Sequence, residues 1–96
     1  MKESEFQHKL KLELKERFPG AIVLKTDANY IQGFPDLLIL WKEHWFALEC
    51  KRKEDAHKQP NQEFYVDLLN QMSFSAFIDP SNKGEVLDDL ERAFKS

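Results

Sequence analysis

Two carboxylates and an amine stand at a suggestive spacing near the middle of the chain. Asp36 precedes the apolar run 37–41, and Glu49 and Lys51 close the next apolar run. Carboxylate oxygens suit Mg²⁺, and a bound divalent cation can polarise a phosphoryl oxygen and activate water. A neighbouring lysine can stabilise negative charge in the transition state. These residue types are therefore those needed for metal-assisted hydrolysis of a phosphodiester.

The three residues can act together only if the two apolar runs pair. Segment 42–44 reads as a tight turn, so we expect strands over 37–41 and 45–51 to form an antiparallel hairpin. Such a turn places Glu49 within about one residue of the position opposite Asp36, which is within cross-strand reach. The hairpin therefore brings the two carboxylates together.

The strand period assigns faces to the second arm of the hairpin. Glu49 and Lys51 are two residues apart and point to one face, while Cys50 points to the other. The Cys50 backbone carbonyl, between the two side chains, is a candidate third metal ligand. Structurally, Asp36 could instead cap a turn and Glu-x-Lys could be an exposed strand edge. Both strands look central, however, and charges closing a buried strand require a reason, for which a metal site is the best candidate.

The remaining segments predict an α/β domain around the hairpin. Apolar residues recur every four positions from Phe6 to Phe18, which predicts a helix over 3–18, capped by Ser4 and ended by Pro19. The expected order is α-β-β-β-α-β-α, a mixed sheet flanked by helices. The other expected elements are a strand over 21–24, a helix over 61–72, a strand over 74–78 and a helix over 83–95.

The same patterns predict what is buried. The continuous apolar run 37–41 is typical of a strand that is covered on both faces. The C-terminal helix should bury Val86, Leu87, Leu90 and Phe94. The buried stripe expected on the second helix consists of Phe64, Leu68, Leu69 and Met72.

Length and composition bound the class of protein. Ninety-six residues predict one domain, 1–96. No apolar stretch could span a bilayer and no signal-peptide core stands at the N-terminus, so we expect a cytoplasmic protein. A single cysteine excludes an internal disulfide, and the three scattered histidines have no zinc-site spacing.

The net charge of −3 gives no direct support for a nucleic-acid partner. The acidic excess lies after residue 58, however, and metal held by first-half acids would make that half effectively more positive. The basic run 51–53, with Lys58, could then meet phosphates. The alternative is that this run is an ordinary solvated charged loop.

The segments Gly33-Phe34-Pro35-Asp36 and Glu49-Cys50-Lys51 together resemble the signature of the PD-(D/E)XK nucleases. More narrowly, nearly the whole chain resembles the virus-type replication-repair nuclease domain (VRR-NUC) in its stand-alone phage form. The resemblance implies a restriction-endonuclease-like core and a DNA endonuclease that uses Mg²⁺ or Mn²⁺. It makes Asp36 and Glu49 metal ligands and Lys51 the catalytic lysine.

The resemblance also implies two further site residues. A glutamine opens the helix after the lysine strand, and Gln62 corresponds best, with Gln59 as its competitor. A glutamate is expected on the first helix. Glu3 lies on the inward stripe of that helix, and the alternatives are Glu5, Glu13 and Glu16. The residues expected to contact the DNA backbone are Lys25, Arg52, Lys53 and Lys58.

The activity implied is that of a structure-selective endonuclease, with four-way (Holliday) junctions as the expected substrate. Two symmetrical cuts need two sites, so a homodimer is expected. Trp45, Phe74 and Phe77 are candidates for its interface, and the sequence does not decide among them. Two alternatives remain: a nuclease with another role in phage DNA processing, and a non-catalytic nucleic-acid or protein interaction module.

Overall fold

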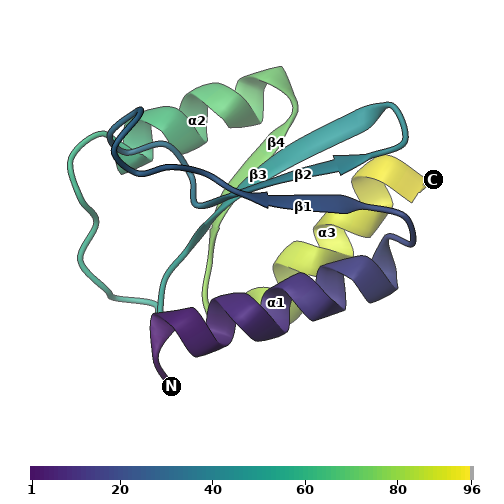
Figure 1. The fold of residues 1–96 in the computed structure, drawn as a ribbon, viewed down its shortest axis with the longest axis horizontal. Coiled ribbons are helices and arrows are strands. Elements are labelled where there is room, and N and C mark those ends of the chain that lie inside the picture. Colours follow the sequence, from purple (N-terminus) through teal and green to yellow (C-terminus); the bar gives the residue numbers. More distant parts are fainter. Residues whose placement is uncertain (96) are drawn as a thin grey trace.

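The computed structural model describes residues 1–95, and Ser96, the last residue of the predicted domain 1–96, lies outside the described residues. The elements follow the predicted order α-β-β-β-α-β-α, with bounds within about one residue of those expected at most ends (Figure 1). They are α1 (Glu3–Arg17), β1 (Ile22–Lys25), β2 (Leu37–Trp41), β3 (His44–Cys50), α2 (Gln62–Met72), β4 (Phe74–Ile78) and α3 (Lys83–Lys95).

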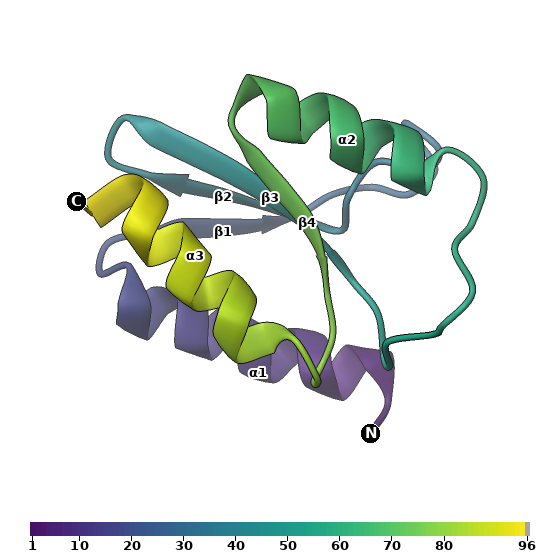
Figure 2. The ribbon, with the colours of Figure 1, turned by 180° about the vertical axis from the view of Figure 1, so that it is seen from behind.

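The four strands form one mixed sheet in the order β1-β2-β3-β4. β1, β2 and β3 pair antiparallel, and β4 joins β3 in parallel. A parallel pair needs a crossover connection, and α2 is that crossover helix. Figures 1 and 2 show α1 and α3 on one face of the sheet and α2 on the other. The fold class predicted from the sequence is confirmed.

The face covered by α1 and α3 holds the hydrophobic core. The predicted stripe of the first helix, Phe6 to Phe18 at every fourth residue, is buried throughout. Phe18 packs edge-on against Trp41, with ring centroids 5.1 Å apart, and the Trp41 indole donates to the Pro19 carbonyl at 3.0 Å. The strands and α3 contribute Leu37, Ile39, Phe46, Leu48, Leu87 and Leu90 to this core.

The hairpin register places the two predicted carboxylates opposite each other. Leu37 pairs with Leu48, and continuing the antiparallel register by one residue sets Asp36 opposite Glu49. Leu37 points into the core, so these two neighbours point to the α2 face because side chains alternate along a strand.

Two details at the helix starts and strand faces differ from expectation. Ser4 does not cap α1, because the helix already begins at Glu3; Lys2 occupies the N-cap position and makes no side-chain capping bond. β2 is not covered on both faces either. Leu40 is 37% exposed, because α2 packs on β3 and β4 and leaves its side of β1 and β2 largely uncovered.

The predicted buried stripe of α2 is also wrong. Phe64, Leu68 and Met72 are all exposed, and only Leu69 of the predicted set is buried. The helix instead turns Gln62, Val66 and Leu69 inward. Its phase therefore points a glutamine into the α2 side of the sheet. Among residues 1–95, none of the helices has the length and apolar character to cross a membrane.

Candidate active site

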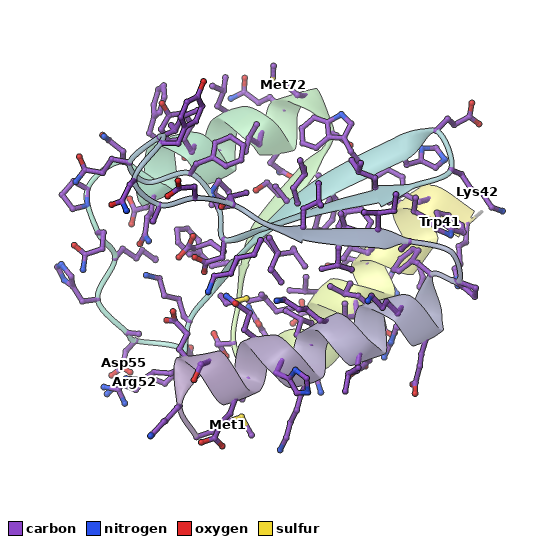
Figure 3. The ribbon with its side chains drawn as sticks, viewed as in Figure 1. Met1, Trp41, Lys42, Arg52, Asp55 and Met72 are labelled. Carbon is purple, nitrogen blue, oxygen red and sulfur yellow. The ribbon has the colours of Figure 1, made fainter. Side chains whose placement is uncertain are left out.

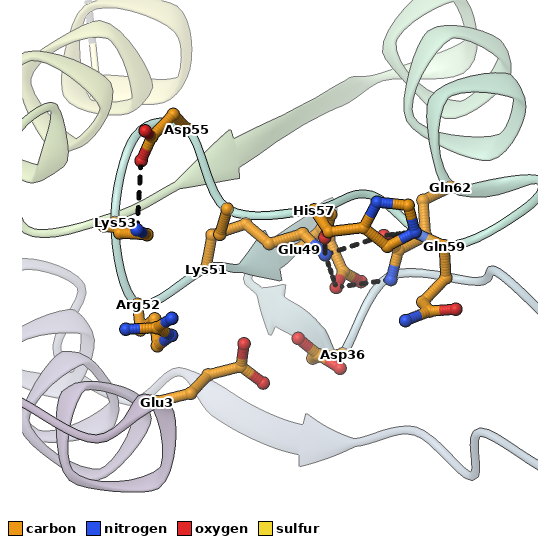
Figure 4. A pocket seen from close by; sticks show the side chains of 11 residues that line it. Glu3, Asp36, Glu49, Lys51, Arg52, Lys53, Asp55, His57, Gln59 and Gln62 are labelled. Carbon is orange, nitrogen blue, oxygen red and sulfur yellow. Dashed lines mark hydrogen bonds and ion pairs between the residues drawn. The ribbon is translucent and has the colours of Figure 1, made fainter.

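A pocket of about 490 Å³ opens where β2 begins and β3 ends. Figure 4 shows the side chains that converge on it from α1, the hairpin and the start of α2. The loop that joins β3 to α2 forms much of its rim. All five residues predicted to be catalytic line this pocket: Glu3, Asp36, Glu49, Lys51 and Gln62.

Asp36 and Glu49 form the carboxylate pair of the pocket. The Asp36 Oδ2 atom accepts a hydrogen bond from the Cys50 amide at 3.0 Å, which fixes it against the end of β3. Glu49 is only 3% exposed, and its Oε1 atom has no hydrogen-bond partner among the described residues. A buried carboxylate oxygen without a partner is costly. The carboxylate pair could therefore be stabilised by a positively charged group at the Glu49 Oε1 atom.

The pKa of Glu49 also shows that its charged form lacks stabilisation. Burial, together with the neighbouring Asp36 carboxylate, raises the pKa of Glu49 to about 8, although Lys51 acts in the opposite direction. Desolvation disfavours the charged form of an acid, and a like charge adds to that effect. A cation bound by the two carboxylates would offset both causes, because it stabilises their charged forms.

Lys51 is held by three groups around its ammonium. Its Nζ atom donates to Gln62 Oε1 at 2.7 Å and to the His57 carbonyl at 3.1 Å, and it lies 3.8 Å from Glu49 Oε2. The residue is 7% exposed, so its position is well defined by these partners. The lysine is aimed into the pocket beside the carboxylates (Figure 4).

Gln62 connects the lysine to the acid. Its Nε2 atom donates to Glu49 Oε2 at 2.9 Å, while its Oε1 atom accepts from Lys51 and from the Gln59 amide at 2.8 Å. One amide group therefore orients both charged side chains. Gln59, the competitor identified in the sequence, also lines the pocket. Its backbone N–H donates to Gln62 Oε1.

The first-helix glutamate in the pocket is Glu3. Burial and the Asp36 carboxylate raise its pKa above the ordinary value, and Lys51, Lys25 and Arg52 act in the opposite direction. Glu13 is instead paired with Lys83 at 2.8 Å. The other two candidates, Glu5 and Glu16, are exposed and do not line the pocket.

The predicted DNA-contacting residues divide into two groups. Arg52 and Lys53 line the pocket, and Arg52 lies beside the N-terminal end of α1 (Figure 3). Lys25, at the end of β1, is near enough to affect the Glu3 carboxyl. Lys58 lies apart from the pocket lining: it pairs with Glu63 at 3.6 Å and stands 4.7 Å from the centre of the Phe77 ring.

The donor set of the pocket fits a hard cation. Asp36 and Glu49 supply two carboxylates, one of which has an unpartnered buried oxygen. Within residues 1–95, no three His, Cys, Asp or Glu side chains gather closely enough to hold a metal by themselves. Mg²⁺ commonly uses one or two carboxylates and completes its shell with water and phosphate oxygens, so two suffice here. Cys50 turns its thiol into the core, where burial raises its pKa to about 12 and keeps it inert.

Sequence reasoning missed the residues that act through backbone atoms. Gly33 has φ +88°, and a Cβ there would lie 2.7 Å from the Asn61 Cβ atom. The motif glycine therefore lets the loop before β2 touch the start of α2, where Gln62 stands. The His57 carbonyl accepts a hydrogen bond from Lys51. Because it is a backbone atom, no residue type in the sequence indicates this contact.

Solved structures with this fold include two described as VRR-NUC. A VRR_NUC domain protein superposes with a TM-score of 0.70 at 14% identity, over 99% of this chain and 89% of that chain. A VRR_NUC domain gives a TM-score of 0.62 at 24% identity, over 91% and 95%. Comparison with protein-family models gives no match, and comparison with curated proteins gives none. The chain has the fold of VRR-NUC domain proteins, as its sequence predicted.

Proposed function

From the VRR-NUC fold and a pocket that joins two carboxylates to an anchored lysine, we propose that this chain is a divalent-metal-dependent DNA endonuclease. The observation that carries the proposal is the chain of contacts Glu49–Gln62–Lys51 beside Asp36. The buried Glu49 oxygen without a hydrogen-bond partner supports a cation site at this carboxylate pair.

Asp36 and Glu49 are the proposed ligands of Mg²⁺ or Mn²⁺, with the Cys50 carbonyl as the third protein ligand. A divalent cation bound there would polarise the scissile phosphate and neutralise charge on its oxygens. The two carboxylates come from neighbouring antiparallel strands, which hold them at a fixed separation. Glu3, the first residue of α1, lies beside Asp36 in the pocket (Figure 4) and would accept a proton or hydrogen bond from the attacking water.

Lys51 supplies the fixed positive charge of the proposed site. Its ammonium already donates to Gln62 and the His57 carbonyl, which leaves its third proton for a phosphoryl oxygen. Because these partners immobilise it before substrate binds, little reorganisation is needed as charge develops on the phosphate. Gln62 is a positioning residue, since it acts on the substrate through Lys51 and Glu49.

DNA would approach over the basic rim of the pocket. Arg52 and Lys53 stand on the loop that forms this rim, and Lys25 stands at the end of β1. Contacts from such residues to phosphates position the backbone without reading the base sequence. Lys58, which is already paired with Glu63, would have to leave this partner to join them.

More narrowly, the proposed enzyme is a resolvase of four-way junctions that acts as a homodimer in the cytoplasm of a phage-infected cell. Two symmetrical cuts require two copies of the site. A 96-residue chain carries one such pocket among its described residues. Selectivity for branched DNA would then come from the spacing and orientation of two identical pockets.

The test is a cleavage assay on labelled four-way junction, linear duplex and single-stranded DNA. The enzyme should cut with Mg²⁺ or Mn²⁺ and not with EDTA, and Lys51→Ala should lower the rate by about 10²–10³-fold. Lys42→Ala, at the far end of the hairpin, is the matched control and should cut normally. Cleavage in EDTA, or undiminished cleavage by Lys51→Ala, would refute the proposed site. Equal cutting of junction and duplex would remove the junction assignment and keep the nuclease.

A further inference from the structure

A smaller cavity, of about 230 Å³, lies in the loop that joins β1 to β2. The ends of this loop are tied together: the Thr26 amide donates to the Asp36 carbonyl at 2.8 Å, and the Thr26 hydroxyl donates to the Pro35 carbonyl at 2.6 Å. Compact loops whose ends lie close together frequently have functional roles. The cavity is lined by Thr26, Asp27, Tyr30, Ile31 and Phe34.

The loop holds this cavity close to the carboxylate pair. Phe34 lies two residues before Asp36, so their Cα atoms are at most about 7 Å apart. The Phe34 ring packs against Tyr65 of α2, with ring centroids 5.8 Å apart. Gly33 lies against Asn61 at the start of the same helix (Figure 1). A DNA strand with its phosphate in the active-site pocket would therefore pass the cavity within about two or three nucleotides, at a rise of about 3.4 Å for each.

Most of the cavity wall is apolar. Tyr30, Ile31 and Phe34 provide it, and Tyr30 is 84% exposed. An exposed aromatic ring can bury its face by stacking on another flat ring. Such stacking is available to every nucleobase, because every base has a π-face. The wall therefore fits a flat ring better than a phosphate or a sugar.

The charged part of the lining is acidic. Asp27 accepts a hydrogen bond from the Asn29 amide through Oδ1 at 2.8 Å, and its second oxygen can accept another. A carboxylate here would repel a phosphate, whereas it can accept from an exocyclic amino group such as N4 of cytosine. The cavity volume lies below the range of roughly 300–1,000 Å³ that is usual for drug-sized ligands. One ring system with a hydrogen-bond donor is therefore the best match.

We propose that this cavity receives one unstacked nucleobase of the bound DNA, with Tyr30 stacked on its face and Asp27 accepting from its amino group. The inference rests on the proposed function, which brings DNA to the neighbouring pocket. Moving a base out of an intact duplex costs free energy, and this cost is smallest where the regular duplex is already interrupted, as at a branch point. The cavity therefore favours branched over linear DNA.

The role of the cavity differs from that of the basic rim. Arg52 and Lys53 on the rim would contact phosphates, which position the backbone and occur in every DNA molecule. An unstacked base is presented more readily by a branched substrate. Lys25 directly precedes Thr26, so one nucleotide can place its phosphate at Lys25 and its base in the cavity. The rim therefore holds DNA, and the cavity selects its shape.

The first test measures binding of a fluorescent four-way junction by anisotropy, in EDTA, which prevents metal-dependent cutting, and at low salt, which strengthens phosphate contacts. Tyr30→Ala should bind about 5–150-fold more weakly, as expected for the loss of one stacked base. Tyr30→Phe is the matched control, because it keeps the ring and should bind like the wild type. Tyr30 is exposed, so neither change should disturb folding. Undiminished binding by Tyr30→Ala, or an equal loss in Tyr30→Phe, would overturn the proposal.

The same variants test the selectivity for branched DNA. On linear duplex, Tyr30→Ala should lose less affinity than on the junction, because the bases of an intact duplex are costly to unstack. An equal loss on both substrates would contradict a site that recognises an unstacked base.

A second test removes the base instead of the ring. Each junction of a set carries a single abasic nucleotide, at successive positions around the branch point. At one position the missing base should weaken binding by the wild type, while Tyr30→Ala should bind that junction and the intact one equally well. Such non-additivity is what a double-mutant cycle reports for two groups in contact. Independent losses at every position would show that the ring and the base do not meet.

Failure of this proposal can be told apart from failure of the proposed function. A protein that cuts junctions with Mg²⁺ but binds them equally well without the Tyr30 ring keeps the nuclease and loses the base site. A protein that binds through Tyr30 and cuts no DNA does the reverse. A wild type that binds no junction in EDTA would overturn the base site, and the cleavage assay would still decide the nuclease.

Discussion

The two faces of the sheet differ in how completely they are covered. The face under α1 and α3 is closed, with Leu10, Leu14 and Phe18 fully buried against the strands. The face under α2 is half open, and its buried positions include Glu49, Lys51 and Gln62. Burying such groups costs free energy that must be recovered by hydrogen bonds or by a ligand. The closed face therefore supplies stability, and the open face holds the groups that need partners from outside.

The largest expected effect is on the closed face. Leu14→Ala should lower the free energy of unfolding by about 2–5 kcal/mol, because it leaves a cavity in a packed core. Leu24→Ala, at an exposed position of β1, should change it by about 0.5 kcal/mol or less. Urea titrations of both variants measure the difference. Similar losses in the two variants would mean that the faces do not differ as described.

Gly33→Ala should disturb the open face alone. The residue has φ +88°, and its new Cβ would collide with Asn61 at the start of α2. We expect a loss of about 1–3 kcal/mol in the free energy of unfolding and a fall in cleavage rate, because Gln62 follows Asn61. Gly20→Ala is the control for the left-handed backbone conformation, since a Cβ there meets nothing within 4 Å. Equal cleavage rates in the two variants would contradict a positioning role for Gly33.

Gln62→Ala should lower activity by about 10–100-fold, as expected when a group that orients a ligand is removed. The reason is the loss of its contacts to Lys51 and Glu49. Gln59→Ala keeps the backbone amide that donates to Gln62, so its cleavage rate should stay near wild type. A larger defect in Gln59→Ala would exchange the roles of the two glutamines.

A separate prediction concerns pH. The pKa of Glu49 is raised from 4.5 to about 8 in the folded protein, so between these values the folded state holds a proton that the unfolded state has lost. The free energy of unfolding should therefore fall as pH rises across this range in metal-free buffer. Denaturant titrations across the range, on wild type and Glu49→Gln, check the sign. The variant should lack this contribution, and an identical pH dependence would show that Glu49 is not its source.

The sequence predicted the closed face better than the open one. The four-residue spacing from Phe6 to Phe18 and the apolar hairpin are strong periodic signals, so the order of elements and the register of Asp36 with Glu49 followed from them. The phase of α2 did not. Hydrophobicity favoured burying Phe64, Leu68 and Met72, whereas the helix turns Gln62 inward to meet Lys51.

The candidate site was also predicted only in part, through its side chains and not its backbone contacts. Charged side chains at motif spacing could be identified, and helical phase favoured Glu3 over the other glutamates of α1. Contacts made by backbone atoms could not be predicted from residue types. The His57 carbonyl on Lys51 and the approach of Gly33 to Asn61 became visible only once the loops were placed.

The most direct test of the central claim compares Asp36→Asn with Asp67→Asn in one cleavage assay. Asp36 stands in the pocket, and Asp67 lies on the exposed surface of α2. Each substitution removes one carboxylate charge with little change in shape. With Mg²⁺ and a labelled four-way junction, Asp67→Asn should cut at the wild-type rate, and Asp36→Asn should cut at about a hundredth of it or less. Equal rates in the two variants would contradict the claim that the open face is a metal-dependent nuclease site.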